Sequence, residues 1–574
     1  MTGAGFATAQ LHDREGGSSN ADTKKEEEEI GGGDDNNNDR DASREEDKEK
    51  IILLRQDTAA DETEEFHEAV WGGVFNRRRE KGRVPLPCAV VRPRCVTDVL
   101  GAVELARSLD PGSGSGSEIE RKKIRRIAIR SGGHSWAAWS VRADAVMLDL
   151  KGLGLTLGMD VDDGRGGEGA GNIYMVFDEK TKVVKVAPAV TGEELNVFLA
   201  AVDADGEGVG GGRMFAGGHC PDVGLGGFLL QGGMGWNCKN WGWACESIVG
   251  VDVVTADGRV IHCSEDENED LFWAARGAGP GFPAIVTAFH LQTRPLLKMY
   301  SSAYLFKAQE WRTALQWVID VAPTADPDTE VVCVAKRLGP NEEVELIAGF
   351  LTFKPCKSLA EAGMSAAHHS RPHHACQVLA FCEETDFANE YRRQREEQPE
   401  GFRYCSDNAY ISNDADDVPG VLEKAFTTLP SKRSFALYFA MNPTSRRQQG
   451  RAEMAHSLQS DHYFAVYSIW DDYGDDDDNN SKGEEEESRC TDWVRDVMGD
   501  VERHSVGSYL GDADFRRRPD TRFWGRKEGE RLREVRRKWD PEGRICGYLD
   551  AHDSSGVYGL SNEFGWVGKE GGGK

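Results

Sequence analysis

Two glycine-rich segments constrain the fold of this chain more than any other feature of its sequence. The first, RSGGHS at residues 130–135, directly follows Ile124 to Ile129, a run typical of a short β-strand. The second spans Arg213 to Trp243 and mixes glycines with aromatic residues, which ordinary core packing does not require. Adjacent glycines after a strand tolerate positive φ angles and let backbone N–H groups approach an anion. The first segment therefore predicts a phosphate-binding loop, with a tight turn as the alternative interpretation.

The charge balance excludes some classes of partner. The 574 residues include 98 Asp and Glu against 69 Lys and Arg, which gives a net charge of -29. So acidic a chain is not expected to bind nucleic acid or an anionic membrane surface. The sequence shows neither a basic start followed by an apolar run, as in a secretory signal, nor an apolar stretch of about 20 residues. We therefore predict a cytoplasmic protein without a membrane segment.

Composition divides the chain into four parts. Residues 1–60 are predicted to be a disordered acidic tail, because residues 1–50 hold 15 acidic against 7 basic side chains. Residues 61–298 alternate between strand-like and helix-like patterns, and residues 299–520 contain long extended runs that predict an antiparallel sheet with helices. Within the latter part, the acidic stretch 474–488 is expected to be a loop insertion. Residues 521–574 form the last part.

Local patterns predict individual elements. Thr191 and Glu194 are spaced as a capping box at the start of a helix. Asp257-Gly258 separates two apolar runs and predicts a hairpin. The extended runs of the second half are Glu330 to Lys336, Glu342 to Phe353, Phe435 to Met441 and Tyr463 to Trp470.

The order of the motifs resembles that of a known enzyme family. They are, in sequence order, Pro85 to Arg92, RSGGHS, Leu148-Asp149-Leu150, GHCPDVGLGGFLLQGGMGW, VVTADG and DLFWAARGAG. This set is similar to the FAD-linked oxidoreductases of the vanillyl-alcohol oxidase / p-cresol methylhydroxylase superfamily, and the closest branch looks like the berberine bridge enzyme-like oxidases. The resemblance covers Pro85 to Pro295 and returns at Phe523-Trp524-Gly525 and Arg531 to Pro541. It therefore implies that residues 521–574 return to the FAD-binding domain, residues 61–298. It implies an α+β two-domain flavoprotein: a PCMH-type FAD-binding domain of two α/β subdomains, and a substrate domain with an antiparallel sheet and covering helices.

The resemblance also implies how the chain holds its cofactor. By motif position, His134 would be bonded to the 8-methyl carbon of the flavin and Cys220 to its C6 atom, so that the FAD is bicovalent. Monocovalent relatives carry other residues at the position of Cys220. Two bonds would hold the ring without a closed lid, which would leave room for a bulky substrate. The residues implied to bind the cofactor are Arg130, Ser131, Gly132, Gly133, His134, Ser135, Cys220, Val223, Gly224, Gly227, Gly232, Gly233 and Val254.

The implied activity is the oxidation of a small molecule. Such enzymes remove a hydride from an alcohol or amine carbon and deliver it to flavin N5. The expected substrate is a carbohydrate or a secondary metabolite, and molecular oxygen would reoxidise the flavin to give hydrogen peroxide. Two alternatives stay open at this point: a flavin dehydrogenase that uses another acceptor, and a flavin-binding protein without catalysis.

Hydride transfer from such a carbon also needs a base that removes the adjacent proton. In berberine bridge-like relatives the base is often the second tyrosine of a Tyr-x-Asn-Tyr motif, and the matching residues here are Tyr509-Leu510-Gly511-Asp512. Asp512 thus replaces that tyrosine, which makes Asp512 and Tyr509 the leading candidates, with Tyr438 as a third. A plain turn is the alternative interpretation of this segment.

No metal site is predicted. A histidine-rich stretch has the composition of a metal site, but its irregular setting is more typical of a solvated segment. Its residues are His368, His369, His373 and His374, with Cys376 close by.

Overall fold

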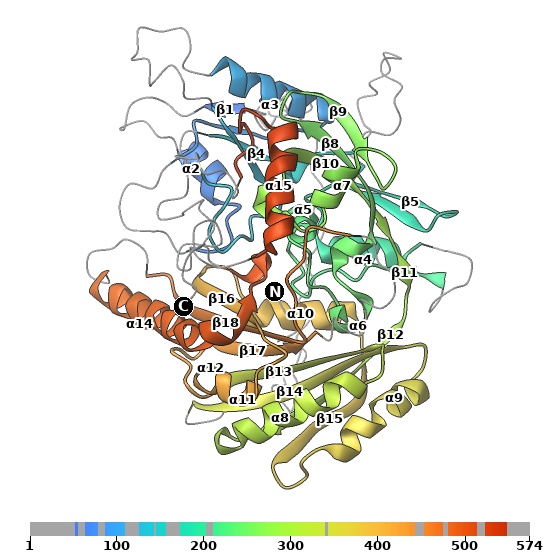
Figure 1. Cartoon of the computed structure of the whole chain (residues 1–574), viewed down its shortest axis with the longest axis vertical. Helices are drawn as coiled ribbons and strands as arrows, with labels where there is room; N and C mark the ends of the chain where they lie inside the picture. Colours follow the sequence, from blue (N-terminus) through green and yellow to red (C-terminus); the bar gives the residue numbers. More distant parts are fainter. Residues whose placement is uncertain are drawn as a thin grey trace, which may run out of the picture.

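The computed structural model describes most of the chain between its two ends. The described residues are 52–54, 64–77, 86–109, 125–142, 145–155, 173–202, 211–338, 342–441, 453–473, 480–513 and 523–547. Sheets of four and five strands lie in the upper half of Figure 1, and a sheet of eight strands lies in the lower half. Most of the predicted acidic tail, residues 1–51 and 55–60, lies outside the described residues.

The first sheet is small and mainly parallel. Its strands, in the order β1-β2-β4-β3, are β1 (Ile52–Leu54), β2 (Ala89–Val91), β4 (Val146–Asp149) and β3 (Ile127–Arg130). Side chains alternate between the two faces of a strand: Val90 packs with helix α2 (Glu64–Trp71), whereas Ala89 and Val91 pack with helix α3 (Val96–Ser108). Strand β1 pairs with β2, so the prediction of a disordered tail is wrong for residues 52–54.

The second sheet is antiparallel, in the order β5-β6-β10-β8-β9. Its strands are β5 (Met175–Asp178), β6 (Val183–Val186), β8 (Ile248–Thr255), β9 (Val260–Cys263) and β10 (Ala284–Gln292). The predicted hairpin around Asp257-Gly258 joins β8 to β9. The predicted capping box starts helix α4 (Gly192–Ala200): the Glu194 N–H donates to Thr191 Oγ1 at 3.2 Å, and the Thr191 N–H donates to Glu194 Oε2 at 2.8 Å.

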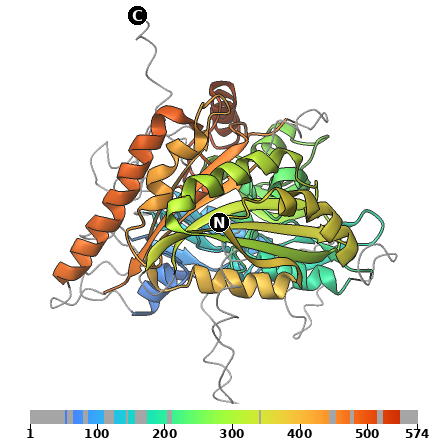
Figure 2. The same ribbon diagram turned by 90° about the horizontal axis from the view of Figure 1, so that it is seen from below.

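The eight-stranded sheet has the order β15-β12-β14-β13-β17-β18-β16-β19 and is antiparallel throughout. Its strands are β12 (Lys298–Phe306), β13 (Thr329–Leu338), β14 (Glu343–Lys354), β15 (Cys376–Thr385), β16 (Phe402–Ile411), β17 (Phe435–Ala440), β18 (His462–Asp471) and β19 (Ser505–Gly507). Helices α8 (Trp311–Val321), α9 (Lys357–Ser370) and α14 (Asn480–Val501) pack on one face (Figure 2). The other face joins the hydrophobic core that holds the second glycine-rich segment.

The acidic stretch 474–488 is not a loop over its whole length. Residues 480–488 form the start of α14, and residues 474–479 lie outside the described residues. Glutamate is a good helix former, and Glu486 is held at both carboxylate oxygens. Tyr473 Oη donates to Glu486 Oε2 at 2.7 Å, and Arg489 Nη2 donates to Oε1 at 3.0 Å. The prediction of a loop insertion is therefore wrong for residues 480–488.

The C-terminal helix α15 (Arg526–Trp539) returns to the upper half of the molecule (Figure 1). Trp539 Nε1 donates to Asp270 Oδ2 at 3.0 Å, in helix α7 (Glu269–Ala274), and Arg536 Nη1 donates to the Gly281 carbonyl at 3.1 Å. Helix α15 is thus held against the segments that carry Asp270 and Gly281. Among the described helices, none has the length and apolar character needed to cross a bilayer.

Candidate active site

A pocket lies where the two glycine-rich segments meet. It encloses about 1260 Å³ of empty space, part of which is open to solvent. Its walls include the RSGGHS loop after β3, the helix α5 (Leu225–Leu230), the Gly279-Pro280 turn and the 509–511 segment. The predicted cofactor residues that line it are Arg130, Ser131, Gly132, Gly133, His134, Ser135, Cys220, Val223, Gly224 and Gly227. The fold therefore brings together motifs that are far apart in the sequence.

Glycines allow the two segments to touch. A Cβ atom on Gly132 would lie 2.4 Å from the backbone nitrogen of Gly224, and a Cβ atom on Gly224 would lie 2.7 Å from the backbone nitrogen of Gly132. Gly133 has a φ angle of +74°, and a Cβ atom there would lie 1.7 Å from the Gly73 carbonyl oxygen. Larger residues at these positions would force the backbone apart.

Replacing Gly132 by alanine should therefore reduce both flavin content and stability. The added methyl group meets backbone atoms, which cannot swing aside, and overpacking of this kind costs about 1–3 kcal/mol. Flavin absorbance per polypeptide and the thermal unfolding midpoint measure the two effects. Gly101→Ala is the matched control, because a Cβ atom at that exposed position in α3 meets nothing within 4 Å. Equal flavin content in the two variants would contradict the importance of this contact.

His134 lines the pocket and has one ring nitrogen without a hydrogen-bond partner among the described residues. Its ring stacks on Phe75 with centroids 4.4 Å apart, and its Nε2 lies 3.6 Å from Asp222 Oδ2. Its Nδ1 is buried and has no hydrogen-bond partner among the described residues. Burial lowers the pKa of His134, although the Asp222 carboxylate acts in the opposite direction. The contact with Asp222 favours the proton on Nε2, which leaves the Nδ1 lone pair available as a nucleophile.

Cys220 lies on the same pocket wall and contacts a residue that the motifs did not indicate. Its Sγ donates to Gln398 Oε1 at 3.3 Å, at the C-terminal end of helix α10 (Phe387–Glu397). Burial raises the pKa of the Cys220 thiol to about 12, with smaller contributions from the Asp222 and Asp512 charges. The group is therefore a thiol at neutral pH.

Four of the predicted cofactor residues have structural roles within the protein. Arg130 lines the pocket, but its guanidinium donates to the Val70 and Ala69 carbonyls and to Asp149 Oδ2, each at 2.7 Å. The other three do not line the pocket. Gly232 and Gly233 form the turn after α5, with φ angles of +112° and +78°. Val254 is buried in β8 against the α3 layer.

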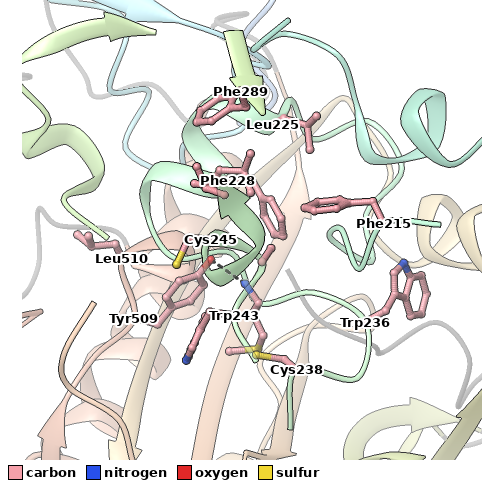
Figure 3. Packing of buried hydrophobic residues seen from close by; sticks show 14 of the residues in the cluster. Phe215, Leu225, Phe228, Trp236, Cys238, Trp243, Cys245, Phe289, Tyr509 and Leu510 are labelled. Atoms are coloured by element: carbon pink, nitrogen blue, oxygen red, sulfur yellow. Dashed lines mark hydrogen bonds between the residues drawn. The ribbon is translucent and has the colours of Figure 1, made fainter. Parts of the chain in front are cut away.

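Tyr509 lines the pocket, and its hydroxyl is already engaged. Figure 3 shows the ring between Leu510, Cys245 and Trp243, with its hydroxyl directed at a backbone nitrogen. That bond is donated by the Met234 N–H at 3.2 Å. Burial, together with the Asp512 charge, raises the pKa of Tyr509 well above its ordinary value. A phenol that holds its proton so firmly is a poor base.

Asp512 follows Gly511, which lines the pocket, and is itself fully buried and outside the lining. Tyr463 Oη, from β18, donates to Asp512 Oδ2 at 2.6 Å, and Ser406 Oγ donates to the Asp512 carbonyl at 3.0 Å. Burial and the Asp512 charge raise the pKa of Tyr463 well above its ordinary value, so this phenol stays a hydrogen-bond donor. Tyr463 belongs to a strand without any motif, and no signal in the sequence pointed to it.

Tyr438 lies on the wrong face of the large sheet for a role in this pocket. In β17, Phe435, Leu437 and Phe439 belong to the core that contains the glycine-rich segment, whereas Tyr438 belongs to the core under helices α8 and α14. Tyr438 Oη lies 2.7 Å from His462 Nδ1, also away from the pocket. The prediction of Tyr438 as a catalytic base is therefore wrong, because side chains alternate along a strand.

The lining suits FAD on two grounds. The close approach of Gly132 and Gly224 leaves backbone rather than side chains along one wall, which suits a phosphate group. The unpartnered Nδ1 of His134 and the thiol of Cys220 are two groups able to form bonds to a flavin ring. His134, Cys220 and the glycines of both segments would hold the cofactor.

Comparisons with known proteins identify the chain as FAD-binding. Residues 87–264 match the family model described as an FAD binding domain. An FAD-linked oxidoreductase of Penicillium janthinellum, janO, is 34% identical over 85% of this chain and 96% of its own. A carbohydrate oxidase of Microdochium nivale is 31% identical over 38% of this chain and 36% of its own. The solved structure of the Physcomitrella patens protein BBE-like 1 has a TM-score of 0.65 at 17% identity, covering 85% of this chain and 94% of that one.

Proposed function

Because this chain belongs to the FAD-linked oxidoreductases, in the berberine bridge enzyme-like branch of the vanillyl-alcohol oxidase / p-cresol methylhydroxylase superfamily, we propose that it is an oxidase. Its substrate is an alcohol or amine carbon of a carbohydrate or secondary metabolite. Bound FAD accepts the hydride at N5 and passes the electrons to molecular oxygen, which leaves as hydrogen peroxide. The similarity to a carbohydrate oxidase supports this choice over an inactive flavin-binding protein.

One observation carries the proposal. His134, with its unpartnered Nδ1, and Cys220, with its thiol, line the same pocket from the two glycine-rich segments. We infer that both are bonded to the flavin, His134 at the 8-methyl carbon and Cys220 at C6. The charge of the Asp222 carboxylate, 3.6 Å from Nε2, favours the tautomer whose Nδ1 can react. Gln398 holds the thiol of Cys220 in place.

The chain also supplies a proton acceptor. Asp512 is a better candidate than Tyr509, because the Tyr509 hydroxyl accepts a bond from Met234 and keeps its own proton. Tyr463 fixes one carboxylate oxygen of Asp512 through a 2.6 Å hydrogen bond. In this proposal Asp512 removes the proton from the substrate hydroxyl or amine as the hydride leaves the neighbouring carbon. Its burial keeps water from competing for that proton.

The experiment is an anaerobic reduction of the purified protein by a panel of sugars, alcohols and amines. We expect at least one member to bleach the flavin absorbance, and readmitted oxygen to restore it with one hydrogen peroxide per substrate oxidised. Recovery with a quinone or dye but not with oxygen would replace the oxidase by a dehydrogenase. A flavin that dithionite bleaches and no panel member does would favour a binding protein without catalysis.

A further inference from the structure

A band of polar side chains crosses the outer face of the five-stranded sheet, away from the pocket. Its members are Lys185 in β6, His290 in β10, Asp252 in β8 and His262 in β9. Lys185 lies opposite His290 in the strand register, and Asp252 lies opposite His262. All four are partly exposed, and none lines the pocket.

The two imidazoles converge on the Asp252 carboxylate, one on each oxygen. His262 Nδ1 lies 2.6 Å from Oδ1, and His290 Nε2 lies 3.1 Å from Oδ2. Burial acts to raise the pKa of Asp252, but the hydrogen bonds from His290 and His262 hold it well below the usual range. The carboxylate is therefore ionised, and one ligand-type atom from each of the three residues lies within 4.8 Å of the other two.

Gly250 makes room for this arrangement. It lies two residues before Asp252 in β8, on the same face of the strand, and opposite His290 in the register. A Cβ atom on Gly250 would come within 2.8 Å of His262 Cε1. A glycine inside a strand gives up packing, and it commonly marks a place where another group approaches the backbone. Here the group that approaches is the His262 ring, which lies across the strand toward Asp252.

We propose that Asp252, His262 and His290 form a binding site for a divalent transition metal ion of the zinc class. Two imidazole nitrogens and one carboxylate oxygen, completed by water, are a common ligand set for Zn²⁺. Ligand atoms about 2.0–2.2 Å from a tetrahedral ion lie roughly 3.4 Å apart, so these atoms need to move only slightly. On binding, each ring proton now shared with Asp252 moves to the other ring nitrogen or to solvent.

Lys185 lowers the affinity of the site for the metal ion. Its Nζ lies 3.0 Å from Asp252 Oδ2, so its ammonium group competes with the metal ion for the same carboxylate. The side chain is partly exposed and can turn to solvent when the ion binds. The ion would then tie the edge strand β9 to the centre of the sheet, because its ligands come from three neighbouring strands.

Zn²⁺ titration calorimetry of the chelator-treated flavoprotein tests the proposal. His262→Gln and His290→Gln should each weaken the tightest site at least tenfold, because even loss of a group that only orients a ligand costs about 10–100-fold. Lys185→Gln should strengthen it. Zn²⁺ should raise the thermal unfolding midpoint of the unsubstituted protein but not of the two histidine variants.

His374→Gln is the matched control, since this exposed histidine lies outside the cluster. It should bind Zn²⁺ as the unsubstituted protein does, which shows that loss of an exposed histidine elsewhere does not weaken binding. Unchanged flavin absorbance confirms that each variant folds. Equal Zn²⁺ affinity in the unsubstituted protein and both cluster variants would overturn the proposal, as would weaker binding on loss of Lys185.

Discussion

Replacing Asp512 by asparagine should slow reduction of the bound flavin by substrate by about 10²–10⁴-fold, the contribution usual for a positioned base. Asparagine keeps the size of the side chain and can still accept from Tyr463, but it cannot take up the proton. Flavin content and the unfolding midpoint should therefore change little. Anaerobic stopped-flow absorbance with the substrate found in the panel measures the reduction step alone.

Two further variants separate the candidates for the base. Tyr509→Phe should leave the reduction rate within about a factor of ten, because the lost hydroxyl accepts the Met234 N–H and holds its own proton firmly. Tyr463→Phe should give an intermediate loss, since it frees one oxygen of the Asp512 carboxylate. A large loss in Tyr509→Phe together with a normal rate in Asp512→Asn would transfer the role of base to Tyr509.

The second large effect concerns the bonds to the flavin. In His134→Ala and in Cys220→Ala the yellow colour should stay with the polypeptide after acid denaturation, because one bond remains in each. In the double variant the colour should move entirely to the supernatant. The fluorescence of denatured bands under ultraviolet light reports the same distribution, and it does so without any need for enzymatic activity.

The single variants also test whether Cys220 is bonded to the flavin. Colour lost completely in His134→Ala alone would mean that Cys220 forms no bond, and the cofactor would then be monocovalent. Cys245→Ala is a suitable control, because this thiol is also buried but does not line the pocket. Its flavin should remain attached as in the unsubstituted protein.

Local signals predicted much of the fold. The capping box at Thr191 and Glu194 and the hairpin at Asp257-Gly258 depend on neighbouring residues only, and both are present. The acidic run before Arg489 was misread, because charge density suggested a solvated loop while the helix propensity of glutamate and contacts with Tyr473 decided the outcome. Composition alone does not reveal such contacts between distant residues.

In the candidate site, too, local motifs were predictable and contacts between distant residues were not. The glycine motifs identified the pocket, since close backbone approach demands glycine wherever it occurs. Tyr463 and Gln398 reach Asp512 and Cys220 only because β18 and α10 pack there. The sequence alone allows Tyr438 as a base, but the strand register places it on the helix-covered face. The packing of the whole sheet decides which face of a strand is turned toward the site. The position of a single tyrosine in an apolar run does not predict that face.

The most direct test of the central claim is the mass of the flavin-bearing peptides from the unsubstituted protein. After acid precipitation and digestion, we expect one flavin to link the peptide containing His134 to the peptide containing Cys220. FAD released intact into the acid supernatant, with both peptides recovered at their unmodified masses, would contradict it.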